Sequence, residues 1–272
     1  MQRLLITGAN GTIGRFLVER MAREDRLLRL LDLGFDEGVE PGPRTELVPG
    51  SADELEVVAA ACAGVDAVVH MGGIAGEAPW DDVLRVNVHG TWCVLEAAHR
   101  AGVPRVVLAS SNHAAGMHGR HEAPAGGLPA DVVARPDTYY GWSKAALEQL
   151  GRLYADRCGL DVVALRIGHC SAEPAGVRAL SNWLSPDDAA RLVEAAVATG
   201  ARGYRQVWGI SRNTRRWLSL AEGEEIGFSP VDDAEVFAER VLAEAGGPGD
   251  PGDPELELVG GDFHDEPLGG RG

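Results

Sequence analysis

Positive charge is scarce in this sequence. Its 272 residues include 25 lysines and arginines against 41 aspartates and glutamates, so the formal net charge at pH 7 is −16. Nucleic acids and anionic membranes both attract proteins through a basic face, and this balance therefore argues against either as a partner. If the ligand is itself an anion, a local arginine must overcome the field of the whole protein.

Long apolar runs and paired cysteines are also missing. The sequence has no run of about 18 apolar residues to span a bilayer. Its first residues, MQRLLITGAN, enter a strand-like run without the layout of a signal peptide. The four cysteines are widely spaced and form no CxxC pair. We therefore expect reduced thiols, no metal site and a cytoplasmic location.

Short apolar runs alternate with longer amphipathic stretches up to residue 168. Most of the runs are continuously apolar, as in strands that are buried on both faces of a parallel sheet. Such alternation predicts an α/β fold with a doubly wound parallel sheet, the Rossmann fold. The predicted strands are 3–7, 27–32, 46–48, 66–70, 105–110 and 161–168, and the predicted helices are 12–23, 53–62, 81–101 and 138–158.

The stretch ITGANGTIG follows the first predicted strand and opens the first predicted helix. Its glycines, Gly8, Gly11 and Gly14, are spaced three apart. Glycines there permit a tight turn and let backbone N–H groups and a helix N-terminus approach a pyrophosphate closely. A plain strand–helix turn is the alternative, but the place of this turn in a chain of βαβ units favours dinucleotide binding.

Asp32 ends the second predicted strand, eighteen residues after Gly14. A carboxylate at this place accepts hydrogen bonds from ribose hydroxyls and repels a 2′-phosphate. It therefore favours NAD over NADP, although a solvent-exposed loop aspartate remains the alternative.

The stretch TYYGWSK, residues 138–144, contains two of the four tyrosines. On a helix Tyr140 and Lys144 share a face, because they are four residues apart, whereas Tyr139 points elsewhere. A lysine ammonium alongside stabilises a phenolate, whose ordinary pKa is about 10. Tyr140 could thus accept a proton near neutral pH. By itself the motif leaves open an aromatic–lysine surface pair.

The pattern loosens after residue 169. Ser185 and Pro186 suit the start of a helix over 185–200, and we expect a further strand at 206–211 and a last helix at 232–245. From residue 246 the chain is rich in glycine, proline and acid, which predicts a tether or surface wrap rather than core. The predicted organisation is a single domain, 1–272, with a dinucleotide-binding and catalytic core (1–168), a small substrate-binding region (169–245) and an acidic tail (246–272).

Three motifs together resemble the extended short-chain dehydrogenase/reductase family: the TGxxGxxG turn, the serine pair in LASSNH and the YxxxK pair. The segments ASSNH, RPDTYYGWSK, LRIG, AEPAGVRALSNWLSPDD, VWGISRNTRRW and GGDF are moreover similar to the bacterial uronate dehydrogenases, over nearly the whole chain. Those enzymes oxidise the anomeric carbon of D-glucuronate or D-galacturonate with NAD and give an aldarolactone.

This resemblance implies a role for each catalytic candidate. Tyr140, as a phenolate, would take the proton of the anomeric hydroxyl while a hydride passes to the nicotinamide. Lys144 would lower the pKa of Tyr140 and hold the nicotinamide ribose, and Ser111 would hydrogen-bond the reacting oxygen. Asn87 is similar to the asparagine that supports the lysine in this superfamily.

The resemblance also implies how a sugar acid is held. Asn112 and His113 would bind ring hydroxyls, and Arg178 would meet the substrate carboxylate, which a planar guanidinium matches bidentately. A structural histidine and a surface arginine are the alternatives. The full predicted NAD site comprises Gly8, Asn10, Gly11, Thr12, Ile13, Gly14, Asp32, Ser51, Ala52, Met71, Gly72, Gly73, Asn87, Tyr140, Lys144 and Ile167.

The sequence departs from the uronate dehydrogenases at three places. Ala75 and His169 stand where the family carries serines that help to hold the sugar acid, and each lost hydrogen bond is worth about 0.5–1.5 kcal/mol. His169 could compensate as a donor or shift the choice of substrate, so both residues stay in the predicted substrate site. Gly50 and Ser51 replace an Asp-Leu pair that usually meets the adenine, where backbone groups or Asp53 could serve instead.

The predicted function is the NAD-dependent oxidation of a hexuronic acid or a related neutral aldose. A nucleotide-sugar epimerase or dehydratase shares the motifs but usually needs a larger C-terminal lobe, and only about a hundred residues follow Gly168. A non-catalytic dinucleotide sensor typically loses the tyrosine or the lysine, and both are present here. Association into a homo-oligomer is left open.

Overall fold

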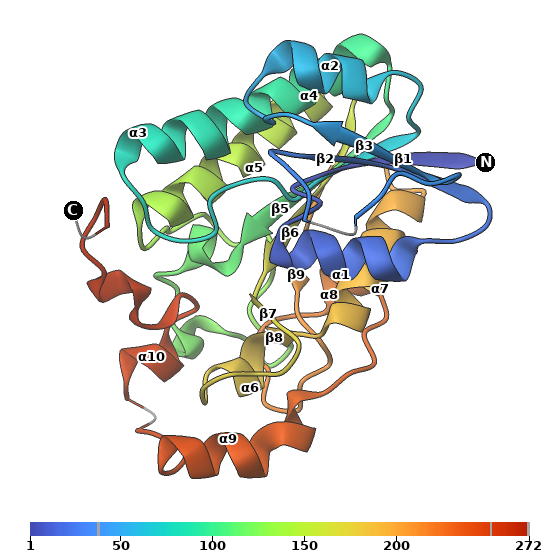
Figure 1. The fold of residues 1–272 in the computed structure, drawn as a ribbon. Coiled ribbons are helices and arrows are strands. Elements are labelled where there is room, and N and C mark those ends of the chain that lie inside the picture. The colour runs from blue at the N-terminus through green and yellow to red at the C-terminus, as the bar shows by residue number, and fades with distance from the viewer. Residues whose placement is uncertain (37–38, 251, 271–272) are drawn as a thin grey trace.

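A seven-stranded parallel sheet forms the centre of the protein (Figure 1). The structure, a computed structural model, describes residues 1–36, 39–250 and 252–270. The strand order is β3-β2-β1-β4-β5-β6-β9, so the chain reverses direction across the sheet between β1 and β4. This order confirms the doubly wound α/β prediction, and the crevice at such a reversal is where these folds bind ligands. The strands are β1 (Gln2–Thr7), β2 (Arg26–Asp32), β3 (Thr45–Pro49), β4 (Ala67–His70), β5 (Arg105–Ser111), β6 (Asp161–Ile167) and β9 (Tyr204–Gly209).

Helices cover both faces of the sheet. Alternate strand residues point to opposite faces: Leu4 and Ile6 join the hydrophobic core on one side, and Leu5 joins the core on the other. Both cores exclude water, which explains why the strands are continuously apolar. The first core packs α1 (Thr12–Met21) and α7 (Pro186–Ala198), and the second packs α2 (Leu55–Cys62), α4 (Gly90–Ala101) and α5 (Tyr139–Cys158). None of the helices in the described part of the chain is long and apolar enough to cross a membrane.

The ends of two helices follow local capping rules. The Thr138 hydroxyl accepts a hydrogen bond from the Gly141 N–H at 3.0 Å and begins α5. The Ser185 hydroxyl accepts from the Asp188 N–H at 2.9 Å, and Pro186 is the first residue of α7, as the sequence predicts. The start of α5 is therefore fixed locally, and with it the position of the tyrosine that follows.

The predicted helix over 81–101 is divided in the structure. It comprises α3 (Trp80–Asp82), a π-helical segment η1 (Val83–His89) and α4. The Thr91 hydroxyl donates to the Asn87 carbonyl at 2.6 Å, where the π-helical segment passes into α4. Such π-helical turns occur mostly at functional sites, and this one carries Asn87.

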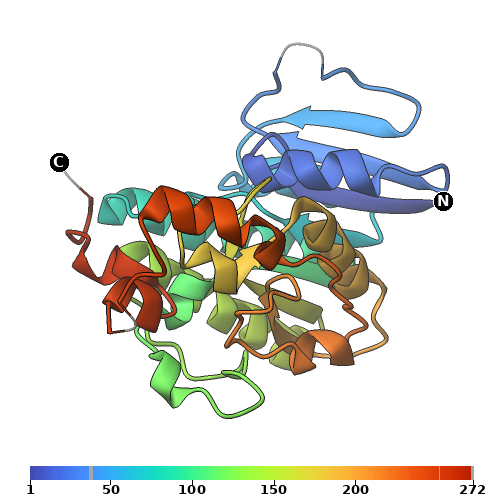
Figure 2. The ribbon, with the colours of Figure 1, turned by 90° about the horizontal axis from the view of Figure 1, so that it is seen from below.

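The C-terminal elements gather below the sheet in the view of Figure 1 and face the viewer in Figure 2, which is seen from below. The largest of them, the predicted helix over 232–245, begins as a 3-10 turn and becomes a regular helix at Ala238. These elements are β7 (His169–Cys170) paired with β8 (Trp183–Leu184), α6 (Ala179–Asn182), α8 (Ala221–Glu225), η4 (Ala234–Phe237), α9 (Ala238–Ala245), α10 (Pro254–Glu257) and η5 (Gly261–Asp265). The 3-10 turns η2 (Asn112–Ala115) and η3 (Arg120–Glu122) follow β5.

The tail does more than wrap the surface. Val259 is only 3% exposed and packs with Trp208 and Leu128 in a hydrophobic cluster. Its N–H donates to the His118 carbonyl at 3.0 Å, and the Gly260 N–H donates to the Gly116 carbonyl at 3.0 Å. The expectation that the tail stays out of the core is therefore wrong at Val259, because a short apolar stretch in a segment rich in glycine, proline and acid gives little compositional signal.

Candidate active site

The glycine turn after β1 forms a backbone cradle. Gly8 has φ +66°, and a Cβ there would lie 2.5 Å from the Gly72 nitrogen, so only glycine fits. The Gly11 N–H donates to the Gly8 carbonyl at 3.1 Å, and α1 begins at the next residue. Gly14 packs directly against the Gly8 carbonyl, where a side chain would collide. The first turn of α1 carries no acidic residue, so its N–H groups favour an anion such as pyrophosphate.

Two cavities meet beside this turn and form one groove. The first has a volume of about 510 Å³ and runs along the carboxyl ends of β1, β2 and β3, and the second has about 360 Å³ and lies at the ends of β5 and β6. Met71, Gly73 and Ile74 line both cavities, so the two are adjacent. Predicted residues that line the first are Gly8, Asn10, Gly11, Asp32, Ser51, Ala52, Met71, Gly72 and Gly73. Those that line the second are Thr12, Ile13, Met71, Gly73, Ala75, Ser111, Asn112, His113, Tyr140, Lys144, Ile167, His169 and Arg178.

Asp32 lies where a ribose-binding carboxylate is expected. One of its oxygens accepts from the Asn10 N–H at 2.8 Å and the other from the Leu33 N–H at 2.8 Å. These bonds fix the carboxylate at the end of β2, and each oxygen can still accept another hydrogen bond. The exposed-loop alternative does not describe this geometry, because Asp32 lines the first cavity.

At the other end of the first cavity, Asp53 is already paired. Its carboxylate is 2.6 Å from the Arg85 guanidinium, and hydrogen bonds from Ser51 and Arg85 hold the pKa of Asp53 below its usual value. Asp53 can therefore reach an adenine only by sharing its oxygens. Sequence reasoning missed Arg85, since it lies in the π-helical segment and belongs to no motif.

Ser111, Tyr140 and Lys144 come together in the second cavity. Ser111 ends β5, and the other two lie on the same face of the first turns of α5. All three are buried, with exposed fractions of 4%, 7% and 6%. The Lys144 ammonium is 5.6 Å from the centre of the Tyr140 ring and donates to the Ala109 carbonyl at 2.9 Å. The predicted trio is thus assembled, with the lysine held against β5.

Burial shifts the pKa of two members of this trio, Tyr140 and Lys144. It raises the pKa of Tyr140, and the hydrogen bond with Ser111 lowers that pKa only in part. It also lowers the pKa of Lys144 to about 8, because an ammonium is poorly solvated inside the protein. The net direction for Tyr140 is therefore upward, and the lowering of its pKa by Lys144 stays a prediction.

Asn87 supports the trio indirectly. Its side-chain oxygen accepts from the Ile74 N–H at 2.8 Å, and its amide donates to the Ser143 hydroxyl at 2.9 Å. The Ser143 hydroxyl in turn donates to the Tyr140 carbonyl at 2.6 Å. Asn87 therefore ties the loop after β4 to the turn of α5 that carries the tyrosine. Like Gly14, it lies behind the groove and does not line it.

Glu77 is a further support that sequence reasoning missed. One oxygen accepts from the Tyr140 N–H at 2.8 Å, at the N-terminus of α5, where a carboxylate is favoured by the helix dipole. The other accepts from the Gly269 N–H at 2.7 Å. A single carboxylate therefore joins the loop of Ala75, the catalytic helix and the tail.

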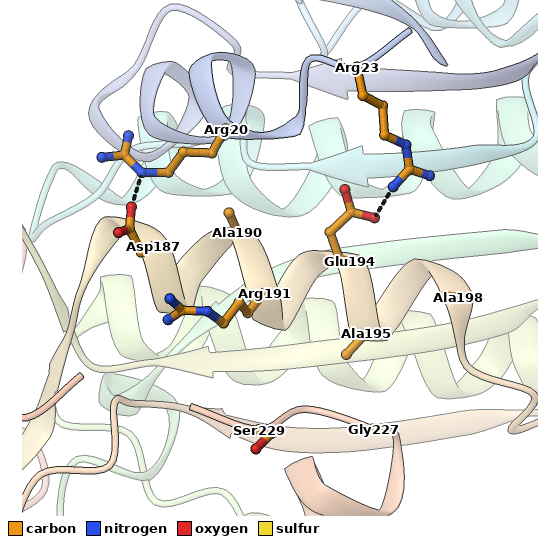
Figure 3. Close-up of a pocket in the computed structure, with 10 residues that line it drawn as sticks. All are labelled: Arg20, Arg23, Asp187, Ala190, Arg191, Glu194, Ala195, Ala198, Gly227 and Ser229. Atoms are coloured by element: carbon orange, nitrogen blue, oxygen red, sulfur yellow. Dashed lines mark hydrogen bonds and ion pairs between the residues drawn. The ribbon is translucent and has the colours of Figure 1, made fainter. Parts of the chain in front are cut away.

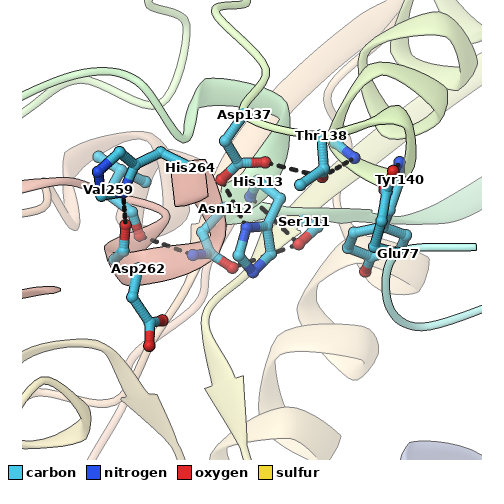
Figure 4. Close-up of polar contacts among 12 residues, drawn as sticks. Glu77, Ser111, Asn112, His113, Asp137, Thr138, Tyr140, Val259, Asp262 and His264 are labelled. Atoms are coloured by element: carbon cyan, nitrogen blue, oxygen red, sulfur yellow. Dashed lines mark hydrogen bonds and ion pairs between the residues drawn. The ribbon is translucent and has the colours of Figure 1, made fainter. Parts of the chain in front are cut away.

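The tail also borders the second cavity through Phe263, and Figure 4 shows the polar contacts around Asn112 and His113. The Asn112 amide donates to the Val259 carbonyl at 2.7 Å. The His113 ring hydrogen-bonds Asp137 at 2.7 Å and packs against Phe263, with 4.1 Å between the ring centres. Phe263 lines the cavity, and the aromatic residue in GGDF was the only signal for it. Asn112 and His113 thus lie in the cavity and also hold structure together.

The two residues that depart from the family pattern both face this cavity. Ala75 presents no polar group. The Nε2 atom of His169 is buried and has no hydrogen-bond partner among the residues that the structure describes. Burial and the nearby Arg178 charge lower the pKa of His169, so the ring is neutral and Nε2 is ready to donate or accept.

Arg178 also lines this cavity, and it shares the Val259 carbonyl with Asn112, the residue after β5. Its side chain is 17% exposed, its Nε donates to Glu255 at 3.3 Å and its Nη1 donates to the Val259 carbonyl at 3.1 Å. The surface-arginine alternative is therefore wrong. Both partners of the guanidinium belong to the tail.

The model of the NAD dependent epimerase/dehydratase family matches residues 4–220. The chain belongs to this family. The family lies in the extended short-chain dehydrogenase/reductase superfamily, as the resemblance implied, and its cofactor is NAD. The positive-φ cradle at Gly8 and the Asp32 carboxylate fit that cofactor: the turn and α1 would hold the pyrophosphate, and Asp32 the ribose.

Within this family the chain is similar to uronate dehydrogenases. It is 40% identical over 268 residues to the enzyme of Agrobacterium fabrum, with 98% of each chain covered. It is 37% identical over 261 residues to that of Pseudomonas syringae, with 96% of this chain and 92% of the other covered. A solved mutant of the uronate dehydrogenase from Agrobacterium tumefaciens, complexed with NAD, superimposes with a TM-score of 0.91 at 39% identity and 100% coverage of both chains.

A separate groove of about 660 Å³ lies between α1 and α7 (Figure 3). It is lined by arginines, but these are paired: Arg20 with Asp187, Arg23 with Glu194, and Arg191 with the buried Asp188. Its charges are balanced locally. None of the predicted catalytic residues lines this groove, so the candidate active site is the groove at the strand ends.

Proposed function

We propose that the chain is an NAD-dependent dehydrogenase that oxidises the anomeric carbon of D-glucuronate or D-galacturonate to the aldarolactone. The observation that carries this proposal is the composition of the second cavity. It holds Ser111, Tyr140 and Lys144 together with Arg178, and it adjoins the NAD cradle. The similarity to uronate dehydrogenases supports the same substrate class.

The reaction transfers a hydride and a proton from the same carbon–oxygen unit. Bound NAD supplies the hydride acceptor. Tyr140, as a phenolate, takes the proton of the anomeric hydroxyl, and the Ser111 hydroxyl donates to the reacting oxygen as it becomes the lactone carbonyl. Because burial raises the pKa of Tyr140, its phenolate needs positive charge nearby, which the Lys144 ammonium contributes.

Arg178 determines which end of the sugar faces away from the tyrosine. A guanidinium binds a carboxylate through two parallel hydrogen bonds, which fix the sugar's orientation as well as its charge. In a protein with a net charge of −16, such a contact also offsets the unfavourable field at the anion's approach. The cavity of about 360 Å³ is at the small end of ligand sites and suits one sugar ring rather than a nucleotide sugar.

A dehydrogenase of a neutral aldose is the second candidate. Ala75 and His169 favour it, because they replace hydroxyls expected at a sugar acid, and His169 lines the cavity with a buried Nε2 that has no partner among the described residues. Arg178 argues against it, since a neutral sugar gives the guanidinium nothing to pair with.

NADH formation, followed by absorbance with purified protein, tests both candidates. The substrates are glucuronate, galacturonate, glucose, galactose and a UDP-sugar, and NADP runs beside NAD. Turnover confined to the two uronates with NAD supports the first candidate. Turnover on glucose or galactose favours the second, and turnover on the UDP-sugar alone contradicts both.

A further inference from the structure

The guanidinium of Arg178 is only half satisfied. Its Nη1 is taken by the Val259 carbonyl, whereas its other edge, formed by Nε and Nη2, has a single partner. That partner is one oxygen of Glu255, 3.3 Å from Nε, and Nη2 has no acceptor in the described part of the chain. The edge with the incomplete partner is one that a carboxylate can bind bidentately.

The backbone of the tail holds the Glu255 carboxylate in place. Its second oxygen accepts from the Asp262 N–H at 2.9 Å. Gly261 lies beside it with φ +66°, and a Cβ there would be 2.5 Å from this oxygen and 2.6 Å from Nε of Arg178. Only glycine lets the backbone lie this close to the ion pair. Phe263, two residues on, lines the substrate cavity.

We propose that Glu255 determines affinity for anionic sugars by occupying Arg178 until the substrate carboxylate displaces it. This inference rests on the proposed function, because it takes Arg178 as the substrate-binding arginine. Two carboxylates cannot share one edge of a guanidinium without strong repulsion. A uronate that binds both Nε and Nη2 must therefore take Nε from Glu255.

The existing pair is weak enough to be exchanged. Glu255 makes one contact, at 3.3 Å and without the bidentate geometry that makes arginine–carboxylate pairs strong. Burial raises the pKa of Glu255 although Arg178 is adjacent. The arginine therefore does not fully offset the loss of solvation of the ionised carboxylate at this position. A neutral sugar has no group that competes for Nε and leaves the pair intact.

The test is Glu255→Gln, which keeps a hydrogen-bond acceptor for Asp262 and removes the competing charge. KM for glucuronate should fall about two- to fivefold, the range expected for a partly exposed ion pair. The kcat and KM for NAD should stay unchanged. Glu257→Gln is the matched control, because it makes the same charge change on α10 and Glu257 forms no ion pair within the described residues. Its kinetic constants should equal those of the unchanged protein.

The direction of the change decides between two roles of Glu255. A KM for glucuronate that is unchanged, or that falls equally in Glu257→Gln, overturns the proposal. A rise in KM overturns it too, since Glu255 would then position Arg178 for the substrate. Glu255→Ala should also lower KM and serves if the glutamine variant does not fold. If the unchanged protein oxidises no uronate, the proposed function fails and this inference fails with it; if it does, a constant KM removes this inference alone.

Discussion

The NAD half and the substrate half of the groove differ in whether backbone groups or side chains form most of the site. The NAD half is built from backbone: the positive-φ turn at Gly8, the close packing of Gly14 and the first turn of α1. The substrate half is built from side chains that come from β5, η2, α5, β7, the residue before α6 and the tail. The turn depends on glycine spacing, with Asp32 as the main side-chain contact expected in the NAD half, whereas the substrate half changes with every side chain substituted in it.

This difference explains where the chain departs from its relatives' pattern. The cradle keeps the full glycine spacing, whereas the departures are at side-chain contacts: Ala75 and His169 in the substrate half, and Gly50 and Ser51 at the adenine end. Exchange of one polar group in the substrate half alters a hydrogen bond worth about 0.5–1.5 kcal/mol and leaves the fold intact. We therefore expect the cofactor to be constant and the substrate to be adjustable.

Tyr140 lies where the two halves meet, and its removal should have the largest effect. Tyr140→Phe removes the proton acceptor and keeps the ring, so turnover should fall at least about a hundredfold. NAD affinity, measured by fluorescence titration, should change little because the cradle is intact. Tyr139→Phe is the matched control, since Tyr139 points away from Lys144. Retained turnover in the Tyr140 variant would contradict the mechanism.

Gly8→Ala should weaken NAD binding and leave the substrate half of the groove largely intact. The added Cβ meets the Gly72 backbone, and the positive φ costs about 1–2 kcal/mol for a residue other than glycine. KM for NAD should rise about tenfold, with a smaller change in KM for the sugar. Gly200→Ala is the control, because a Cβ there has open space and an ordinary φ. Equal losses for both substrates would show that the turn supports the whole groove rather than one half.

Arg178→Ala should weaken uronate binding and leave the NAD half of the groove intact. A hydrogen bond to a charged group contributes about 1.5–3 kcal/mol, so KM for uronates should rise about tenfold or more. KM for a neutral aldose and KM for NAD should change little. Initial-rate kinetics with glucuronate and glucose measures the difference, and an equal loss on both sugars would remove the carboxylate role of Arg178.

The sequence was sufficient wherever structure follows from local rules. Continuous apolar runs predicted the buried parallel strands, and Ser185 with Pro186 predicted the start of α7. The glycine spacing predicted the cradle, because positive φ and close backbone approach leave few alternatives to glycine. Spacing by four placed Tyr140 and Lys144 on one face of α5, and the structure brings both to Ser111.

It was insufficient wherever the site depends on segments far apart in the chain. Glu77 and Gly269 are joined by a hydrogen bond across most of the sequence, and no local pattern predicts such a contact. Phe263 lies in a segment whose composition resembles a loose tail. The protonation of Tyr140 depends on how completely the folded chain desolvates it, which a four-residue spacing does not reveal.

Restoration of the two serines should have the smallest effect and tests how adjustable the substrate half is. Ala75→Ser and His169→Ser each offer a hydroxyl to the sugar, and the double variant should lower KM for glucuronate about two- to tenfold, with KM for NAD unchanged. That result would mean that the present residues are tolerated rather than used. If His169→Ser instead raises KM for glucuronate while Ala75→Ser does not, then the buried Nε2 of His169 is itself a substrate contact. The two single variants therefore show whether this half of the groove has lost a hydrogen bond or exchanged it for another.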